Sequence, residues 1–342
     1  TEMDVVDNGL RYDLTVPLVR FYSNNANNLP SPFKALQIGN VWRADRPQRG
    51  RYRQFTQCDI DILGEPSDLA EIELILATTT CLDRIGFKGF EIRINERRIL
   101  KAMAEYCGFD EDRFDILFIT LDKMDKIGLD GVKSELIEEG FDAAAVDKYL
   151  DIFNQLKDKK DVTEGVETLA SILGDSLDPE IVSNMKEIAE NVNDCKTADF
   201  ELVFDPTLVR GMGYYTGTIF EIAIPEFGGS CGGGGRYDHM VGRFAGHEVP
   251  ACGFSIGFER IIMLLLEHDF QIPQKPKTAF LIDKKLESGK LASVIKEANS
   301  LRADGQTVLI ERMKKNKKFQ KQGLTDSGYT EIKEFYNDTI EN

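Results

Sequence analysis

The stretch RADRPQRGRYRQFTQCDID, residues 43–61, decides the fold that we predict for this sequence. The run before it, residues 35–42, is mostly apolar and predicts a strand, and residues 53–63 alternate in the way typical of a second strand. Pro47 and Gly50 lie between the two runs, in positions that suit a turn. The stretch therefore predicts a β-hairpin with a long tip.

This hairpin concentrates positive charge in a chain that is otherwise acidic. The formal net charge of the chain is −16, yet five arginines crowd this one segment: Arg43, Arg46, Arg49, Arg51 and Arg53. Guanidinium groups bind phosphate oxygens bidentately and do not lose their charge. The hairpin therefore suits an anionic, planar ligand such as a nucleoside triphosphate. The alternative is a solvated basic loop that only aids solubility.

Length and composition bound the rest of the interpretation. A chain of 342 residues predicts two or three domains, and a hydrophobic content of 42% is ample for a globular core. The acidic balance disfavours binding of nucleic acid through bulk charge, so any such contact needs a local basic patch.

The cysteines and the apolar runs argue against several classes of protein. The six cysteines lie far apart and none forms a CxxC pair, so a zinc site and a disulfide framework are both poorly supported. Buried free thiols in a reducing compartment are the preferred interpretation. The apolar run at residues 261–266 is far too short to cross a membrane. We therefore expect a cytoplasmic protein with no membrane partner and no metal site of its own.

Strands and helices are predicted on both sides of the hairpin. Upstream, residues 7–9 (DNG) predict a hairpin turn, residues 10–17 a strand, and a short helix follows through residue 22. On such a strand Asp13 and Thr15 face the same side. Downstream, we predict a helix over residues 67–85, a strand over 90–95 and a helix over 96–107.

The character of the chain changes between residues 107 and 197, where glycine is sparse and apolar residues recur at helical spacing. We interpret this segment as an inserted helical domain. Strand patterns return at residues 200–204, 218–224 and 252–256, and a helix is predicted over 259–268. After a linker at residues 273–276, a strand (278–282), a helix (286–303) and a strand (307–310) begin a small α/β domain. Residues 319–328 show no clear period.

Five blocks of sequence together resemble the histidyl-tRNA synthetases, in an order and spacing that cover nearly the whole chain. They are RYDLTVP (11–17), the arginine hairpin (42–61), LVRGMGYYTGTIFE (208–221), SCGGGGRYDHMV (230–241) and PACGFSIGFERI (250–261). The hairpin resembles motif 2 of class II aminoacyl-tRNA synthetases, and GFSIGFERI resembles motif 3. The third and fourth blocks resemble the two histidine-specific signatures. No motif 1 is visible, and we expect that a further N-terminal portion precedes Thr1.

The resemblance implies an α+β fold with four parts. A class II catalytic core built on an antiparallel sheet is expected in two pieces, residues 1–106 and 199–273, around a helical insertion at residues 107–198. Residues 277–342 are expected to form a small C-terminal α/β domain of the anticodon-binding type, and to be incomplete.

For ATP, the resemblance implies a set of contacts in which arginines dominate. Activation of an amino acid is attack of its carboxylate on the α-phosphate of ATP, so two anions must be brought together. Arg43 matches the residue that binds the α-phosphate and the carboxylate, and Arg51 lies where the outer phosphates are bound. Phe55 is placed to stack on adenine, and Arg260 matches the motif 3 arginine on the other face of the nucleotide. Asp45 completes the predicted ATP site, and Mg²⁺ is expected with the nucleotide.

Two arginines have alternative interpretations. Arg210 matches the extra arginine that this family uses at the α-phosphate, and with Arg43 and Arg260 it forms the predicted catalytic set; the alternative is a buried structural arginine. Arg260 could instead form a surface ion pair with Glu259 or Glu267.

A histidine pocket requires acceptors for the imidazole N–H groups and for the ammonium group. Asp13 and Thr15 match the ammonium contacts of the family, and Gln57 and Asp61 lie four apart on one face of the second strand. Asp61 stands where some members have glutamate, which shortens its reach. Gly213 replaces an aspartate of other members. The predicted histidine-binding residues are Asp13, Leu14, Thr15, Arg43, Gln57, Asp61, Arg210, Tyr214 and Tyr215.

These expectations lead to one preferred function and two alternatives. The preferred function is a histidine–tRNA ligase that uses L-histidine, ATP and tRNA(His) and works as a homodimer. The first alternative is a non-catalytic, histidine-binding regulatory paralogue of ATP phosphoribosyltransferase; such paralogues lack the C-terminal α/β domain. The second is an unrelated nucleotide-binding module, which leaves both histidine-specific signatures unexplained. None of the three histidines lies in a matched catalytic position, so a histidine general base is not supported.

Overall fold

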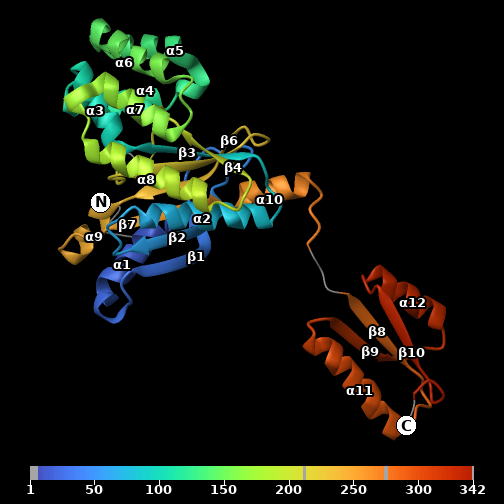
Figure 1. Cartoon of the computed structure of the whole chain (residues 1–342). Coiled ribbons are helices and arrows are strands. Elements are labelled where there is room, and N and C mark those ends of the chain that lie inside the picture. Colours follow the sequence, from blue (N-terminus) through green and yellow to red (C-terminus); the bar gives the residue numbers. More distant parts are fainter. Residues whose placement is uncertain (1–6, 211–212, 273–275, 341–342) are drawn as a thin grey trace. The chain divides into compact units, whose positions relative to one another are not determined.

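The computed structural model describes residues 7–210, 213–272 and 276–340. It divides into two compact units, Thr1–His268 and Asp269–Asn342, and each is described by itself (Figure 1). In the described parts, no helix is both long enough and apolar enough to cross a membrane. The further division of the first unit into a catalytic core and an insertion stays a prediction.

A mixed seven-stranded sheet forms the centre of the first unit, in the order β1-β2-β7-β6-β5-β3-β4. All neighbouring strands are antiparallel except the parallel pair β3 and β4. This confirms the predicted α+β fold with a mainly antiparallel sheet, and β1 and β2 confirm the predicted hairpin. The strands are β1 Phe33–Trp42, β2 Gln54–Leu63, β3 Phe90–Glu96, β4 Phe200–Phe204, β5 Thr218–Ile224, β6 Gly229–Arg236 and β7 Ala251–Gly257.

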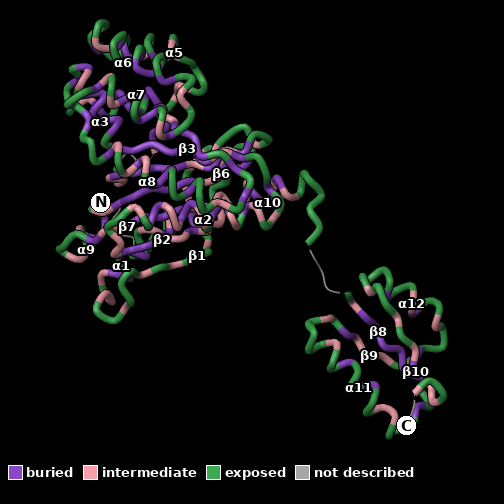
Figure 2. The backbone as a smooth tube through the Cα atoms, in the orientation of Figure 1, coloured by how far each residue is buried: buried purple, intermediate pink, exposed green. Residues whose placement is uncertain are grey.

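Two helices, α2 and α10, contact strands β2 and β7. Apolar side chains from this side of the sheet, among them Ile62 and Phe254, join the main core. Figure 2 shows the central strands buried and the outer helix surfaces exposed. The helices associated with the sheet are α1 Thr15–Asn25, α2 Leu69–Arg84, α3 Arg97–Cys107, α9 Asp238–Ala245 and α10 Phe258–Glu267.

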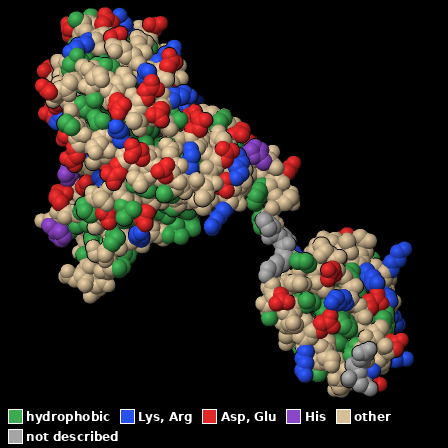
Figure 3. Space-filling model, in the orientation of Figure 1, with side chains coloured by type: hydrophobic (Ala, Val, Ile, Leu, Met, Phe, Trp, Pro, Cys, Tyr) green, Lys and Arg blue, Asp and Glu red, His purple; other side chains and the backbone are tan. Residues whose placement is uncertain are grey.

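The predicted helical segment forms five α-helices that share the main apolar core with the sheet. Three of them begin at an aspartate whose side chain accepts a backbone N–H of the first turn: Asp142, Asp161 and Asp178. Acidic side chains spread over the outside of this segment (Figure 3). The helices are α4 Phe114–Leu121, α5 Met124–Glu138, α6 Ala143–Leu156, α7 Val162–Leu173 and α8 Pro179–Cys195.

In the second unit a three-stranded parallel sheet has the order β10-β8-β9. Apolar clusters form on both of its faces, one around Phe280 with α11 and one around Leu281 with α12. Most of the stretch 319–328, which lacks a clear period, belongs to α12, a helix that ends at Asp326 and is capped at its start by the side chain of Asn316. The elements are β8 Lys277–Ile282, α11 Ser288–Ala303, β9 Thr307–Arg312, α12 Lys317–Asp326 and β10 Glu331–Phe335.

The strand predicted over residues 10–17 is wrong. Helix α1 already begins at Thr15, and the Asp13 carboxylate accepts the N–H of Val16 at 3.0 Å. That hydrogen bond satisfies a donor at the start of the helix, and Pro17 is tolerated there because first-turn N–H groups have no helical partner. Asp13 and Thr15 are therefore not two positions on one face of a strand.

Candidate active site

One face of the sheet presents a row of polar side chains from β2. Gln57, Asp59 and Asp61 alternate along this strand and point to the face opposite the apolar Ile60 and Ile62, as the two-residue period of a strand requires. All three polar side chains are at least nine-tenths buried. The polar row therefore lies inside the protein, where unpaired polar groups are costly.

Glycines make room for this row on the neighbouring strands. A Cβ atom at Gly253 on β7 would lie 2.1 Å from Asp61 Oδ1, and a Cβ at Gly233 on β6 would lie 2.5 Å from Arg210 Cζ. The glycine run at residues 232–235 was not predicted as a strand. It forms β6 because side chains and backbone from distant segments approach it closely.

Two adjoining cavities open on this face. The arginine cavity has a volume of about 270 Å³, and the aspartate cavity about 290 Å³. The arginine cavity is lined by Arg43, Asp45, Gly50, Arg51, Tyr52, Phe55, Gln57, Arg210, Tyr214, Tyr215, Ser230, Gly232, Gly233, Ser255, Ile256, Gly257, Glu259 and Arg260. The aspartate cavity is lined by Tyr12, Asp13, Thr15, Arg43, Gln57, Asp59, Asp61, Tyr214, Tyr215, Gly233, Tyr237, Gly253, Phe254 and Ser255.

The structure brings together the predicted site residues, which come from four of the five sequence blocks, with one exception. Leu14 does not line either cavity; its side chain is buried, and its carbonyl accepts a hydrogen bond from Gln37 Nε2 at 3.3 Å. The three predicted catalytic arginines line the arginine cavity, and Arg43 borders both cavities. The roles of these residues stay predictions.

Arg43 lies at the junction of the cavities and is held by aromatic rings. Its Nε donates to the carbonyl of Tyr12 at 3.2 Å, and its Cζ lies 4.4 Å from the centroid of the Tyr12 ring and 4.9 Å from that of Phe55. Both distances are in the range of cation–π contacts. Phe55, predicted to stack on adenine, thus contacts a guanidinium group in this structure.

Arg210 is oriented by a residue that the sequence analysis missed. Its Nε and Nη2 lie 2.8 and 2.7 Å from Oε2 of Glu221 on β5, and Nη2 also donates to the carbonyl of Gly232 and to Ser230 Oγ. Glu221 lies in the third sequence block, but nothing in the local spacing pairs it with Arg210. The interaction fixes the guanidinium group at the wall of the cavity.

Arg260, at the start of α10, does not form the ion pairs that were its alternative interpretation. It donates to the carbonyls of Gly50 and Ser230, whereas Glu267 pairs with Arg49 at 2.9 Å. Glu259 accepts the backbone N–H of Thr56. Burial lowers the pKa of Arg260, although an arginine stays protonated at neutral pH.

Asp61 lines the aspartate cavity and is almost fully buried. Tyr237, a residue missed by the sequence analysis, donates its hydroxyl to Asp61 Oδ1 at 2.6 Å, while Oδ2 is buried without a hydrogen-bond partner. Burial raises the pKa of Asp61 to about 7, against the opposing effect of that hydrogen bond. The free oxygen is an acceptor that a ligand N–H could satisfy.

Two tyrosines form a wall shared by the cavities. The ring centroids of Tyr214 and Tyr215 lie 4.3 Å apart, and Tyr214 packs edge-on against Tyr237 at 6.2 Å. Burial raises the pKa of both Tyr214 and Tyr215, so their hydroxyls stay protonated and can donate. Gly213, where other members have aspartate, has open space beside it.

A buried ion pair anchors β6 to α2 beside the aspartate cavity. Arg236 donates from Nε and Nη2 to the two carboxylate oxygens of Glu71, each at 2.6 Å, and also to the carbonyls of Glu65 and Ser67. Glu71 is 0% exposed. Two parallel hydrogen bonds of this kind fix both the position and the orientation of the Arg236 and Glu71 side chains.

Among the described residues, no group of three or more His, Cys, Asp or Glu side chains could hold a metal ion by itself. A Mg²⁺ ion that travels with a nucleotide needs only one or two carboxylates besides the phosphates. Asp45 and Glu259 line the arginine cavity and supply such groups.

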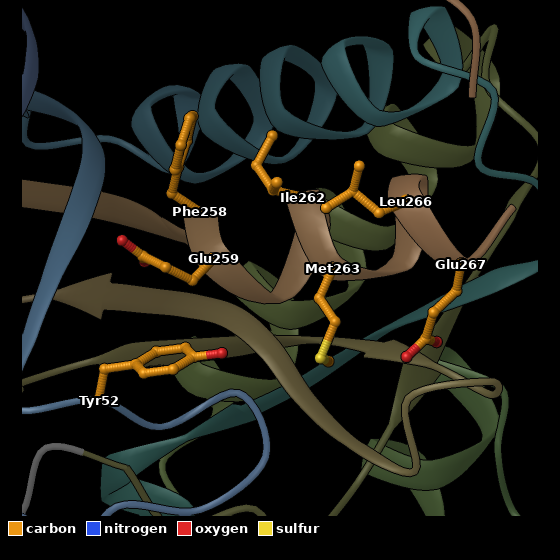
Figure 4. A pocket seen from close by; sticks show the side chains of 7 residues that line it. All are labelled: Tyr52, Phe258, Glu259, Ile262, Met263, Leu266 and Glu267. Atoms are coloured by element: carbon orange, nitrogen blue, oxygen red, sulfur yellow. The ribbon is translucent and has the colours of Figure 1, made fainter. Parts of the chain in front are cut away.

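A third cavity lies along α10 and is mostly apolar. Figure 4 shows Phe258, Ile262 and Leu266 pointing from one side of the helix and Met263 from the other, while Tyr52 lies near the helix on the side of Met263. None of the three predicted catalytic arginines lines this cavity, whose volume is about 450 Å³. It offers little for binding charged ligands.

Comparisons with known proteins identify the family. Residues 7–261 match the sequence pattern of the family described as histidyl-tRNA synthetase. A histidine–tRNA ligase of Leifsonia xyli subsp. xyli is 47% identical over 320 residues, 92% of this chain and 72% of that protein. A histidine–tRNA ligase of Korarchaeum cryptofilum is 35% identical over 316 residues, 92% of this chain and 71% of that protein.

Solved structures show the same fold. The crystal structure of histidyl-tRNA synthetase from Nostoc sp. PCC 7120 superposes with a TM-score of 0.78 at 28% identity and covers 93% of this chain and 74% of that one. A Bacillus halodurans structure described as an ATP phosphoribosyltransferase regulatory subunit/histidyl-tRNA synthetase has a TM-score of 0.72 at 20% identity, covers 95% of this chain and 79% of that one, and bears on the fold alone. By sequence and by structure, the chain belongs to the histidyl-tRNA synthetase family.

Proposed function

We propose that the two adjoining cavities are where the chain activates histidine with ATP before its transfer to tRNA(His), the reaction for which its relatives are named. One observation carries this proposal. Guanidinium groups from three separate segments, Arg43, Arg210 and Arg260, line one cavity, and a cavity with buried carboxylates adjoins it. That pairing fits a triphosphate beside a cationic amino acid.

The reaction that this arrangement suits is in-line phosphoryl chemistry. A carboxylate oxygen of histidine attacks the α-phosphorus of ATP, the bond to the bridging oxygen breaks, and pyrophosphate leaves with the electron pair. Arg43 borders both cavities and can contact the carboxylate and the α-phosphate together, which reduces their mutual repulsion. Arg210 and Arg260 line the cavity on either side of Ser230 and can stabilise charge that develops on phosphate oxygens. Mg²⁺, when bound with ATP, neutralises charge on the outer phosphates.

For histidine, the aspartate cavity supplies acceptors and a donor. The free Oδ2 of Asp61 can accept an imidazole N–H, and Tyr214 and Tyr215 supply hydroxyl groups. A pocket with unpaired buried polar groups rejects a ligand that leaves them unpaired, whereas an apolar pocket rejects isosteres weakly. The cavity therefore favours a side chain that carries N–H groups over an apolar one of the same size.

The regulatory alternative is the weaker of the two functions. The resemblance implies that regulatory paralogues relax the catalytic positions and lack a C-terminal α/β domain. Here Arg210 is held at the cavity wall by Glu221, and residues 277–335 form a three-stranded parallel sheet with two helices. Both features support the ligase.

Histidine-dependent exchange of labelled pyrophosphate into ATP tests the proposal, since the exchange requires reversible formation of the adenylate. We expect exchange that saturates with L-histidine and is absent with phenylalanine, because phenylalanine leaves Asp61 unpaired. A folded preparation that binds histidine but gives no exchange would favour the regulatory alternative.

We also infer that the chain works as a homodimer through strand β1, at the edge of the sheet. Leu36 and Ile38 on this strand are 67% and 64% exposed, and their partners across the pair, Ile60 and Cys58, belong to the side that helices cover elsewhere. An uncovered apolar sheet face at this position suits a second copy. Light scattering should give twice the chain mass for the wild type and the single mass for Leu36→Glu. Ile119→Glu, at an exposed apolar site on α4, is the control and should leave the mass unchanged.

For tRNA, the exposed lysines around the start of α12 are candidates for phosphate contacts. Lys314, Lys315 and Lys318 are all exposed in this part of the second unit, and ammonium groups bind the phosphate backbone without reading sequence. The alternative is a solvated basic segment that contacts no nucleic acid. A cytoplasmic location, where charged tRNA is consumed, also stays a prediction.

A further inference from the structure

Asp59 is a buried acid of the aspartate cavity to which the activation reaction above assigns no role. It lies on β2 between Gln57 and Asp61, on the same face as both, and is 3% exposed. It lines the aspartate cavity. The sequence analysis named its two neighbours on this face but not Asp59, although the alternation of the strand predicts that all three point the same way.

The Asp59 carboxylate is only partly satisfied by the protein. Its Oδ1 is buried and has no hydrogen-bond partner. Burial raises the pKa of Asp59 to about 6; a hydrogen bond from Ser255 and the charge of Arg43 lower it, whereas the charge of Asp13 raises it. A buried carboxylate with a free oxygen is costly unless a donor or a cation pairs with it.

The neighbouring groups indicate which part of a ligand would lie against Asp59. Arg43 lines both cavities and so marks the place where they adjoin, whereas Asp61 and its partner Tyr237 line the aspartate cavity alone. Asp59 and Asp61 are two residues apart on one strand, which separates them by about 7 Å. A histidine whose carboxylate contacts Arg43 and whose imidazole contacts Asp61 has its ammonium group between them.

Asp13, another acidic residue that lines the aspartate cavity, already accepts a hydrogen bond from the backbone. Its Oδ1 accepts the N–H of Val16 at 3.0 Å and so helps to begin helix α1. One carboxylate oxygen already used in this way leaves less capacity for an ammonium group, which has three donors. The free Oδ1 of Asp59 supplies a further acceptor.

We propose that Asp59 binds the α-ammonium group of histidine and thereby selects for an amino acid over a carboxylic acid with the same side chain. This inference rests on the proposed function and adds a binding residue to it. Loss of one charge-assisted hydrogen bond costs about 10- to 100-fold in affinity. Asp59→Asn keeps the size of the side chain and removes its charge, so it should raise the KM for histidine by that factor and leave the KM for ATP within about twofold.

Two analogues separate an ammonium contact from a structural role. Histidinol keeps the ammonium and imidazole groups, whereas imidazole-4-propionate lacks the ammonium group. With calorimetry on the whole chain, Asp59→Asn should weaken histidinol about 10- to 100-fold and imidazole-4-propionate by less than twofold. Asp61→Asn is the matched control and should weaken both analogues, because both contain the imidazole ring.

Several outcomes would overturn the assignment. If Asp59→Asn weakens both analogues equally, Asp59 contacts the ring or supports the cavity; if it weakens neither, Asp59 does not touch the ligand. Asp59→Ser serves as a second variant should Asp59→Asn fail to fold, and the same pattern is expected. A wild-type chain that shows histidine-dependent exchange while the variants fail to discriminate overturns this inference alone. A wild-type chain that shows neither exchange nor analogue binding overturns the proposed function as well.

Discussion

Arg210→Ala is expected to reduce histidine-dependent pyrophosphate exchange by at least about 10³-fold while histidine affinity changes far less. Arginines that stabilise a phosphoryl transition state contribute on the order of 10³ to 10⁵ in rate. The guanidinium group of Arg210 is held by Glu221 at the wall of the arginine cavity, so its loss removes a fixed positive charge where the α-phosphate is expected. Exchange rates and calorimetric histidine binding on the same preparation measure the two effects.

Two further variants test whether the expected loss of exchange is specific to Arg210. Arg20→Ala, at an exposed position of α1, removes an arginine that lines neither cavity and should leave exchange unchanged. Glu221→Gln keeps the shape of the side chain but removes the charge that pairs with Arg210. It should therefore reduce kcat more than it raises the KM for histidine. Normal exchange by Arg210→Ala would contradict the catalytic role and leave the structural interpretation.

Arg236→Ala is expected to destabilise the first unit by about 3 to 5 kcal/mol. The substitution leaves Glu71 buried, charged and without its bidentate partner, and removal of one member of a buried ion pair costs about this much. It also leaves the carbonyls of Glu65 and Ser67 without a donor. Urea unfolding followed by the fluorescence of Trp42, the single tryptophan, reports on this unit alone.

A double variant distinguishes an unpaired charge from lost packing. Arg236→Met combined with Glu71→Leu replaces both charges with apolar groups of similar size, which for buried pairs is often neutral or stabilising. We therefore expect the double variant to recover most of the lost stability. A single variant within about 1 kcal/mol of the wild type would show that water or another group compensates for Glu71.

The spacing of apolar residues predicted those strands and helices in which this spacing is regular. The alternation of β2 and the apolar run of β1 predicted the hairpin, and helical spacing predicted α2 and the helices between residues 107 and 198. The three arginines predicted to be catalytic came from resemblance in sequence, and the structure adds that they line one cavity. Asp59 could also have been predicted as a residue of the cavity, because it alternates with Gln57 and Asp61 along β2.

Other features depend on partners that are distant along the chain. Strand β6 is rich in glycine, which disfavours strands, yet glycine suits it here because Arg210, Tyr215 and the backbone of the neighbouring strands approach it closely. The partners Tyr237 and Asp61 are 176 residues apart, and Arg236 and Glu71 are 165 apart. The start of α1 was missed because the sequence LRYDLTVPL alternates as a strand does. In the structure, the Asp13 side chain instead accepts the backbone N–H of Val16 at the start of the helix.

The glycines that floor the two cavities have a consequence for how substrate choice can drift over generations. Glycine is the smallest residue, so any substitution at Gly233 or Gly253 adds atoms where a Cβ already meets Arg210 or Asp61. Substitutions at these two glycines can therefore narrow the two cavities but cannot widen them. A descendant of this sequence that keeps the same backbone can therefore make room for a bulkier amino acid only by changes elsewhere in the cavities.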